Sequence, residues 1–234
     1  MTARAKKPSK SKSRPPRKAD AKQRADLFFY ERLAFDQGAR VLAGIDEVGR
    51  GPLAGAVVAA AVILPRDFTH PFLTDSKLLT PEQRECIYAE LTSRPEVAWS
   101  IGIVDHQEID RVNILVATYL AMRAAVDNLR PAADFLLIDG RPVPVFSRMR
   151  QIAIVQGDQK SYSIAAASVI AKVTRDRLMV QMHERYPQYD FKSHKGYSTP
   201  EHLQALAQFG PCPIHRRSFF PVRQEPVEEN LFEL

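Results

Sequence analysis

The stretch AGIDEVGRGPLAG, residues 43–55, joins an apolar run to two adjacent carboxylates and then to a glycine-rich turn. The apolar residues from Val41 predict a buried strand that ends at Asp46 and Glu47, and the next run, 55–64, predicts a second strand. Two carboxylates this close repel each other and raise each other's pKa unless a positive charge lies nearby. The stretch therefore predicts a central strand whose end needs a cation.

The apolar pattern elsewhere alternates between short runs typical of strands and longer segments typical of helices. We expect strands at 97–104, 135–139 and 152–155, and helices from Thr80 to about Ser93, from about Asn113 to Leu129, from Ser161 to about Arg185 and from Thr199 onward. Hairpin-like junctions are expected after the first strand and across 140–151. This interleaving predicts one α/β domain with a mixed sheet.

Three of the predicted strands end in or beside an acid. Besides Asp46 and Glu47, Asp139 closes the strand at 135–139, and Asp158 follows the strand at 152–155. Strand ends in α/β sheets are rigid places on which sites are built. Carboxylate oxygens are ligands for hard divalent cations such as magnesium, and no histidine lies near these acids to favour zinc. The pattern therefore predicts a site for divalent cations made from four carboxylates.

Two considerations leave this interpretation open on the residues alone. Alternation along a strand sends Asp46 and Glu47 to opposite faces, so a shared site requires a kink, which Gly49 and Gly51 would permit. Each acid can also simply cap a strand or helix or face solvent. For Asp158, which lies just ahead of a predicted helix, that alternative competes strongly.

Charge is concentrated at the N-terminus. Residues 1–24 carry ten Lys and Arg against a single acid, whereas the whole chain has a formal net charge of +6, so the remainder is net negative. A segment of Lys, Arg, Ser, Pro and Ala has little to bury and is expected to be disordered. It serves either as an arm that attracts nucleic acid through counterion release or as a solubilising tail.

Location and redox state follow from simple features. The basic N-terminus lacks the apolar segment of a secretory signal, and no apolar stretch approaches the roughly 18 to 20 residues of a membrane span. Cys86 and Cys212 form neither a disulfide framework nor a zinc pattern. These features predict a cytoplasmic protein without a membrane segment.

Six motifs occur in an order that resembles bacterial ribonuclease HII: GIDEVGRGPLAGAVV (44–58), DSKLL (75–79), LLIDG (136–140), QGDQKSYSIAAASVIAKVTRD (156–176), SHKGYSTP (193–200) and HRRSF (215–219). The resemblance implies a ribonuclease H-like fold, with a mixed five-stranded sheet flanked by helices and a helical C-terminal extension. It also implies endonucleolytic cleavage of the RNA strand of RNA/DNA hybrids and nicking 5′ to single ribonucleotides embedded in duplex DNA. Two-metal-ion hydrolysis with Mg²⁺ or Mn²⁺ would leave 5′-phosphate and 3′-hydroxyl ends.

The resemblance also assigns roles to individual residues. Asp46, Glu47, Asp139 and Asp158 match the catalytic and metal-binding acids of the family. The segment Gly49, Arg50 and Gly51 resembles the family's ribose-reading segment, and Tyr197 resembles the tyrosine that packs on the neighbouring deoxyribose. Five further residues resemble phosphate-contacting positions: Lys77, Lys172, His194, Lys195 and Arg216. From the residues alone, the glycines also fit a tight turn, Tyr197 a packing aromatic and the basic residues solvated surface charges.

We expect three segments: a disordered basic arm at 1–25, a ribonuclease H-like catalytic domain at 26–221 and a flexible acidic tail at 222–234. The expected partners are RNA/DNA hybrids and ribonucleotide-containing duplex DNA, and the protein is expected to be a monomer. Leu231 and Phe232 faintly resemble the anchor pair of sliding-clamp-binding peptides, although an acidic end that folds back on basic surface is favoured.

Two other functional classes compete. A non-catalytic nucleic-acid-binding protein would be expected to have lost one of the four acids, and all four are present. The other class is a related hybrid-cleaving enzyme, ribonuclease HIII, or a different nuclease on the same fold. Ribonuclease HIII would be expected to carry an additional N-terminal substrate-binding domain, whereas here only a short polar arm precedes the first motif. The complete segment Gly49, Arg50 and Gly51, together with Tyr197, also favours junction cleavage, as the resemblance to ribonuclease HII implies.

Overall fold

The structure is a computed structural model, which describes residues 26–73 and 75–223. A mixed sheet runs through it in the order β3-β2-β1-β4-β5. Its strands are β1 (Leu42–Val48), β2 (Val57–Ile63), β3 (Ala98–Val104), β4 (Phe135–Asp139) and β5 (Arg150–Ile154). β1 pairs antiparallel with β2, and β2 with β3, whereas β4 lies parallel to both β1 and β5. The predicted mixed five-stranded sheet is confirmed.

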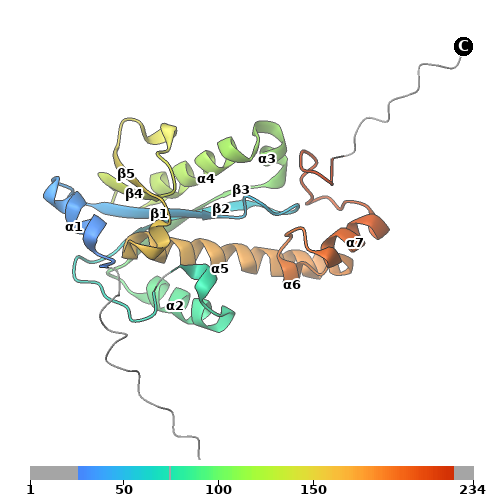
Figure 1. Cartoon of the computed structure of the whole chain (residues 1–234), viewed down its shortest axis with the longest axis horizontal. Helices are drawn as coiled ribbons and strands as arrows, with labels where there is room; N and C mark the ends of the chain where they lie inside the picture. The colour runs from blue at the N-terminus through green and yellow to red at the C-terminus, as the bar shows by residue number, and fades with distance from the viewer. Residues whose placement is uncertain (1–25, 74, 224–234) are drawn as a thin grey trace, which may run out of the picture.

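Helices cover both faces of this sheet (Figure 1). The described helices are α1 (Phe29–Asp36), α2 (Pro81–Ser93), α3 (His106–Val112), α4 (Ile114–Asn128), α5 (Tyr162–Arg185), α6 (Phe191–His194) and α7 (Pro200–Phe209). α4 packs on one face and α5, with α2 behind it, on the other, while α6 and α7 gather at the far end of α5 (Figure 1). Within the described ranges, no helix combines the length and the hydropathy that crossing a membrane requires.

One expectation about local structure was wrong, and two helices were missed. β4 and β5 are parallel, so the segment 140–149 between them is a crossover connection and not a hairpin. The helices α1 and α3 were not predicted. Asn113, at φ 70°, separates α3 from α4, and its side chain accepts hydrogen bonds from the first backbone N–H groups of α4. The predicted helix start at Asn113 is therefore also the junction between two helices, α3 and α4.

Two glycines let the helices lie directly on the sheet. A Cβ on Gly44 of β1 would stand 2.1 Å from the backbone carbon of Ser163 in α5, and one on Gly102 of β3 would stand 2.0 Å from the carbonyl oxygen of Ala121 in α4. No side chain fits at either point, because interiors are packed close to the density of organic crystals. The place of α5 over β1 is therefore set by backbone contact.

The start of α5 is fixed by a buried carboxylate. Glu31 of α1 accepts hydrogen bonds from the Ser161 hydroxyl (2.7 Å) and the Ser163 N–H (2.9 Å). Burial raises the pKa of Glu31, and these hydrogen bonds partly offset that rise. The contact ties α1 to the N-terminus of the helix that passes the candidate site.

Candidate active site

Parallel pairing brings two of the predicted acids to the same edge of the sheet. Ile45 of β1 pairs with Ile138 of β4, so the residues that follow them, Asp46 and Asp139, lie next to each other at the carboxyl ends of their strands. Asp158 lies in a short turn, Gly157–Gln159, just after β5. The N–H of Gly157 donates to Asp139 Oδ1 (2.7 Å), which ties this turn to β4.

The expected kink between Asp46 and Glu47 is not present. The β1–β2 ladder continues without interruption through Val48, and the chain turns only at Gly49, where φ is +96°. The two side chains therefore leave the strand on opposite faces, but both lie near the same third acid, Asp139, through which they can belong to one cluster. The hydroxyl of Ser168 in α5 favours the charged form of Asp46. The negative charge of Asp139 raises the pKa values of both Asp46 and Glu47.

Burial and like charge raise the pKa values of this group. The pKa of Asp46 lies well above its usual range, first because the side chain is buried and then because of the neighbouring Glu47 and Asp139. Burial, followed by the charges of Asp75 and Asp139, raises the pKa of Asp158 to about 6. Ionised together, these carboxylates repel one another, so the cluster has a net affinity for positive charge.

A fifth acid, Asp75, was not predicted as part of the site. It is buried, accepts from the N–H of Lys77 (2.8 Å) and from the Gln159 side chain (3.2 Å), and raises the pKa of Asp158. Lys77 Nζ lies 3.6 Å from Asp158 and 3.9 Å from Asp75, and among the described residues it is the one cation that forms an ion pair with either acid. Asp75 opens the DSKLL motif but ends no strand, so a search along strand ends passes over it.

The donor set fits a hard divalent cation that is only partly coordinated by protein. Among the described residues, no group of three or more His, Cys, Asp or Glu side chains is arranged so that it could hold a metal ion by itself. Magnesium, however, usually binds through one or two carboxylates and completes its coordination with water and substrate phosphate. Buried, mutually repelling carboxylates at one sheet edge suit that mode.

The glycine loop that follows β1 lies beside the predicted tyrosine. A Cβ on Gly49 would stand 2.3 Å from Nε of Arg175, so the close approach and the positive φ both require glycine there. A Cβ on Gly51 would lie 4.0 Å from the ring of Tyr197. Tyr197 is 38% exposed, so part of its ring stays open to a ligand. The loop is joined to the acids by the Arg50–Glu47 ion pair (3.3 Å).

Arg216 corrects one of the predicted phosphate contacts. Its side chain is completely buried, and it donates to the carbonyl oxygens of Gly55 (2.9 Å), Arg50 (3.0 Å) and Gly49 (2.6 Å). The guanidinium therefore holds the glycine loop and does not face a phosphate. Burial lowers the pKa of Arg216 to about 9, so it remains charged at neutral pH.

Arg175 of α5 was not predicted as part of the site. Like Arg216, it holds backbone around the glycine loop by donating to carbonyl oxygens. This completely buried side chain donates to the carbonyl oxygens of Ala56 (3.0 Å), Lys195 (3.0 Å) and Ala54 (3.2 Å), and its guanidinium lies 5.7 Å from the Tyr197 ring centre. The available signal was helical register: Arg175 lies four residues after Ala171 and four before Met179, both buried, so it falls on the buried face of α5.

His194 also departs from its predicted role. Its Nδ1 accepts from the N–H of Gly196 (3.1 Å), so Nε2 carries the proton and donates to the carbonyl of Tyr189 (2.6 Å). The ring stacks on His202 with 4.4 Å between centres. Both nitrogens are therefore engaged with backbone, and the phosphate contact predicted for His194 is replaced by a structural one.

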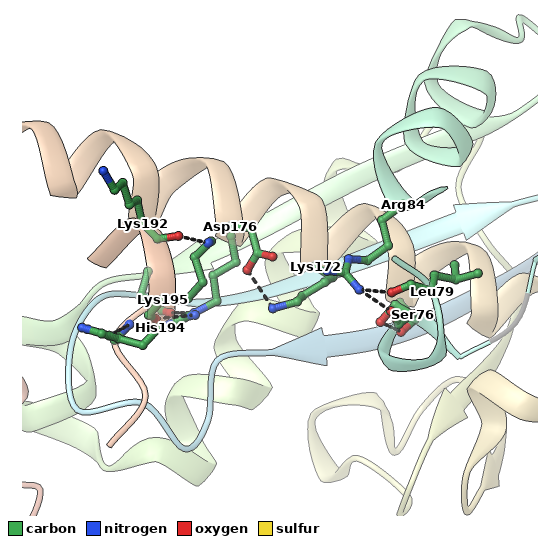
Figure 2. Close-up of polar contacts among 12 residues, drawn as sticks. Ser76, Leu79, Arg84, Lys172, Asp176, Lys192, His194 and Lys195 are labelled. Carbon is green, nitrogen blue, oxygen red and sulfur yellow. Dashed lines mark hydrogen bonds and ion pairs between the residues drawn. The ribbon is translucent and has the colours of Figure 1, made fainter. Parts of the chain in front are cut away.

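Lys172 and Lys195 line one groove along α5. The groove has a volume of about 680 Å³, and Arg84, Arg177, Glu85 and Asp176 also line it. Figure 2 shows Lys172 beside Asp176 (2.8 Å) and the Lys195 ammonium turned toward the Lys192 carbonyl. Burial lowers the pKa of Lys172, and Asp176 counters that shift. The structure thus brings two of the five predicted phosphate contacts into one groove, and Lys77 lies apart beside the acids.

Comparison with known proteins now adds the family. The family model described as Ribonuclease HII matches residues 43–222. A relative from Listeria monocytogenes serotype 4a, a ribonuclease HII, is 53% identical over 195 residues, which cover 83% of this chain and 74% of that protein. Among solved structures, ribonuclease H2 from Pyrococcus horikoshii superposes with a TM-score of 0.67 at 28% identity, covering 79% of this chain and 96% of that one.

A second solved structure is the complex of PCNA with RNase HII from Archaeoglobus fulgidus. It matches with a TM-score of 0.63 at 25% identity and covers 80% of this chain and 98% of that one. The family model spans most of the chain, and the Listeria relative exceeds half identity over most of its length. This chain therefore belongs to the ribonuclease HII family and is a hydrolase of the ribonuclease H type, an endonuclease that acts on RNA/DNA hybrids.

Proposed function

We propose that this enzyme, beyond cleaving the RNA strand of hybrids, nicks duplex DNA on the 5′ side of a single embedded ribonucleotide, leaving 5′-phosphate and 3′-hydroxyl ends. The observation that carries the proposal is the contact between the two parts of the site. The acid-bearing strand β1 runs directly into the Gly49–Gly51 loop, and that loop lies against Tyr197. This arrangement supports a site in which hydrolysis takes place next to sugar recognition.

Asp46, Glu47, Asp139 and Asp158 are the residues that would hold the divalent cations. When bound, Mg²⁺ or Mn²⁺ supplies a polarised water as nucleophile and neutralises charge on the departing 3′ oxygen. The protein's own share is position: three backbone elements, β1, β4 and the turn at Gly157–Gln159, hold the carboxylates before substrate arrives.

The glycine loop is equipped to bind a ribose 2′-hydroxyl. Arg216 already occupies the carbonyl oxygens of Gly49 and Arg50, whereas the N–H groups of Arg50 and Gly51 donate to no other residue in the described ranges. Those N–H groups are free to donate to the 2′-oxygen, the atom that separates RNA from DNA. The exposed part of Tyr197 would pack on the deoxyribose that follows.

Phosphate contacts are assigned to two places. Lys77 lies beside the acids, and Lys172 and Lys195 lie in the groove along α5, where the duplex backbone would pass. The basic arm and the tail with Leu231 and Phe232 lie outside the described residues. For the arm we propose non-specific duplex affinity. For the tail we propose sliding-clamp binding, which the PCNA complex of the Archaeoglobus enzyme supports over the alternative that the tail folds back on basic surface. We place the enzyme, as a monomer, in the cytoplasm, where such duplexes occur in bacteria.

The test is a DNA duplex with one ribonucleotide, incubated with Mg²⁺ or Mn²⁺ and mapped at nucleotide resolution. We expect one nick, 5′ to the ribonucleotide, with the end groups stated above. An all-DNA duplex should stay intact, and an all-RNA strand in a hybrid should be cut. Cleavage of the hybrid without cleavage of the single-ribonucleotide duplex would refute the proposal while leaving the family assignment in place.

A further inference from the structure

Three backbone segments far apart in sequence are joined behind the glycine loop. The N–H of Leu53 donates to the carbonyl of Gly196 (2.8 Å), and the carbonyl of Leu53 accepts from the N–H of Arg216 (2.8 Å). The N–H of Gly55 donates to the carbonyl of Ile214 (2.9 Å). The loop, the segment that carries Tyr197 and the chain before Arg216 therefore form one hydrogen-bonded unit.

Within this unit, Arg216 supports the loop through a set of hydrogen bonds that a lysine cannot form. Its three nitrogens reach three separate carbonyl oxygens, of Gly49, Arg50 and Gly55, across a turn that contains a positive φ. No carboxylate of the described residues forms an ion pair with Arg216. The planar guanidinium is thus used entirely to set the loop's backbone, whereas the ammonium of lysine is a single point charge.

Two buried histidines extend the connection to Tyr197. The Nδ1 of His202 faces the carbonyl of Tyr197 (2.8 Å), and because a carbonyl only accepts, Nδ1 carries the proton. The N–H of Cys212 donates to Nδ1 of His215 (3.0 Å), which leaves the His215 proton on Nε2 to be donated to Nε2 of His202 (3.0 Å). Burial lowers the pKa of both rings, which keeps both neutral at pH 7.

His215 is the residue before Arg216, so the path has no break. It runs from the Tyr197 carbonyl through His202 and His215 to the Arg216 guanidinium, and from there to the carbonyls of the glycine loop. His202, His215 and Arg216 are all completely buried. Because they are buried, none of the three can touch a substrate. They act on the distance between the glycine loop and Tyr197, which are the two surfaces that meet the substrate.

We propose that Arg216 and His202 are positioning residues that hold the Gly49–Gly51 loop and Tyr197 at one fixed separation, and that this separation selects a ribose followed by a deoxyribose. The inference rests on the proposed function, because it concerns how the same site recognises a junction. Two adjacent sugars must be met at once by two different segments of chain. Misplacement of such groups by about 1 Å can cost on the order of 100-fold in rate.

The experiment compares variants on two substrates, the single-ribonucleotide duplex and an all-RNA hybrid. We expect Arg216→Lys to lower kcat on the single-ribonucleotide duplex by about 30- to 100-fold, with KM within about threefold and the hybrid rate within about fivefold. The selective loss of kcat follows because the phosphate contacts, which hold substrate, are left in place.

His202 offers a pair of variants that separates donation from packing. An asparagine amide can reach the place of Nδ1 and donate to the Tyr197 carbonyl, whereas phenylalanine fills the space without a donor. His202→Phe should lose junction cleavage by about 10-fold or more, and His202→Asn should stay within about threefold of the parent. The matched control is Arg150→Lys, which alters an arginine that also donates to two carbonyls, of Gln37 and Gly38, away from the site and should leave both rates unchanged.

The outcomes separate the two proposals. If the parent enzyme cuts the hybrid but not the single-ribonucleotide duplex, the proposed function fails, and the positioning proposal fails with it. If the parent nicks the junction and the folded variants lose the same factor on both substrates, or lose nothing, the positioning proposal alone is overturned. Should Arg216→Lys not fold, as judged by circular dichroism, the two His202 variants decide, and equal behaviour of the pair overturns the proposal.

Discussion

Two neighbouring regions of this enzyme bury charge of opposite sign and satisfy it in opposite ways. At the strand ends, Asp46 and Asp158 are buried beside other carboxylates, and Lys77 forms an ion pair with Asp158. Around the loop that follows β1, Arg175 of α5 and Arg216 are completely buried without forming an ion pair with any described carboxylate, and each donates to three backbone carbonyls.

The difference follows from the chemistry of the groups. A guanidinium has five N–H donors in a rigid plane, so carbonyl oxygens of a folded loop can satisfy it completely. A carboxylate only accepts, and a cluster of carboxylates stays repulsive until cations arrive. The arginine-held region is therefore complete once the chain has folded, whereas the acid region becomes complete only with metal ions and phosphate.

The strongest way to break this contrast is Asp139→Asn. An amide oxygen can still accept from the N–H of Gly157, so the turn at Asp158 should keep its place, but one negative charge is lost. We expect cleavage of both substrates to fall by about 1,000-fold or more, with the circular dichroism spectrum unchanged. Full activity in this variant would show that the acid region is not the metal site.

Tyr197→Ala tests the part of the site that recognises the sugar, and the expected loss of activity is smaller. Removing the ring deletes the surface beside Gly51 but leaves the acids untouched. We expect about a 30-fold loss on the single-ribonucleotide duplex and less than about fivefold on the all-RNA hybrid, because only the junction requires packing on a deoxyribose. Tyr197→Phe is the control and should retain most junction cleavage. Equal loss on the two substrates would contradict a role in junction reading.

The incomplete state of the acid region predicts a pH effect on stability. The folded-state pKa of Asp158, about 6, lies above its ordinary value of 3.8, so between those pH values the folded protein holds a proton that the unfolded chain releases. The stability of the metal-free protein should therefore fall as pH rises from about 4 to 6 and stay low above that range. Divalent cations should reverse this loss where the acids are ionised.

We expect 10 mM Mg²⁺ to raise Tm by about 3–5 °C at pH 7.5 and by less than about 1 °C at pH 4.5, measured by calorimetry. Asp158→Asn serves as the control, because it should reduce both the pH slope and the gain from Mg²⁺. A Tm that ignores Mg²⁺ at both pH values would refute the idea that the region is completed by cations.

The smallest expected effect concerns the basic arm, residues 1–24, which would attract the duplex over long range and belongs to neither region. Removing residues 1–24 should weaken duplex binding at low salt and flatten the dependence of log K on log salt, by up to about 0.9 for each phosphate contact that is lost. Cleavage position should not change, because neither region is altered. An unchanged salt slope in a binding titration would assign the arm no role in duplex affinity.

Much of the fold could be predicted because it depends on local patterns. Apolar runs located the strands, and Thr80 and Gln83 marked the start of α2, where both halves of the capping box are present. The crossover at 140–149 could not be predicted, because parallel pairing depends on distant parts of the chain. The helix start at Asn113 was predicted, but the short helix α3 that ends just before it was missed.

The candidate site shows the same limit. Acids at strand ends are visible as a pattern, and the structure places Asp46 and Asp139 side by side as expected. Sequence shows that Arg216 carries a charge but not that the side chain is buried, so its donors were assigned to phosphate instead of to the loop's carbonyls. Asp75 was missed because it lies in a turn, outside the pattern that was searched.

The direct backbone contact of Gly44 with Ser163 fixes α5 along β1, so that the helix sets the distance between the two parts of the site. Along this one helix, Ser168 faces Asp46 and Arg175 holds the carbonyls beyond the glycine loop, and the seven residue steps from Ser168 to Arg175 make two turns, about 10.5 Å. Because the helix cannot slide on β1, the interval between bond cleavage and sugar recognition is set by a count of residues. One residue inserted between Ser168 and Arg175 would turn one end by about 100° against the other and put the two out of phase.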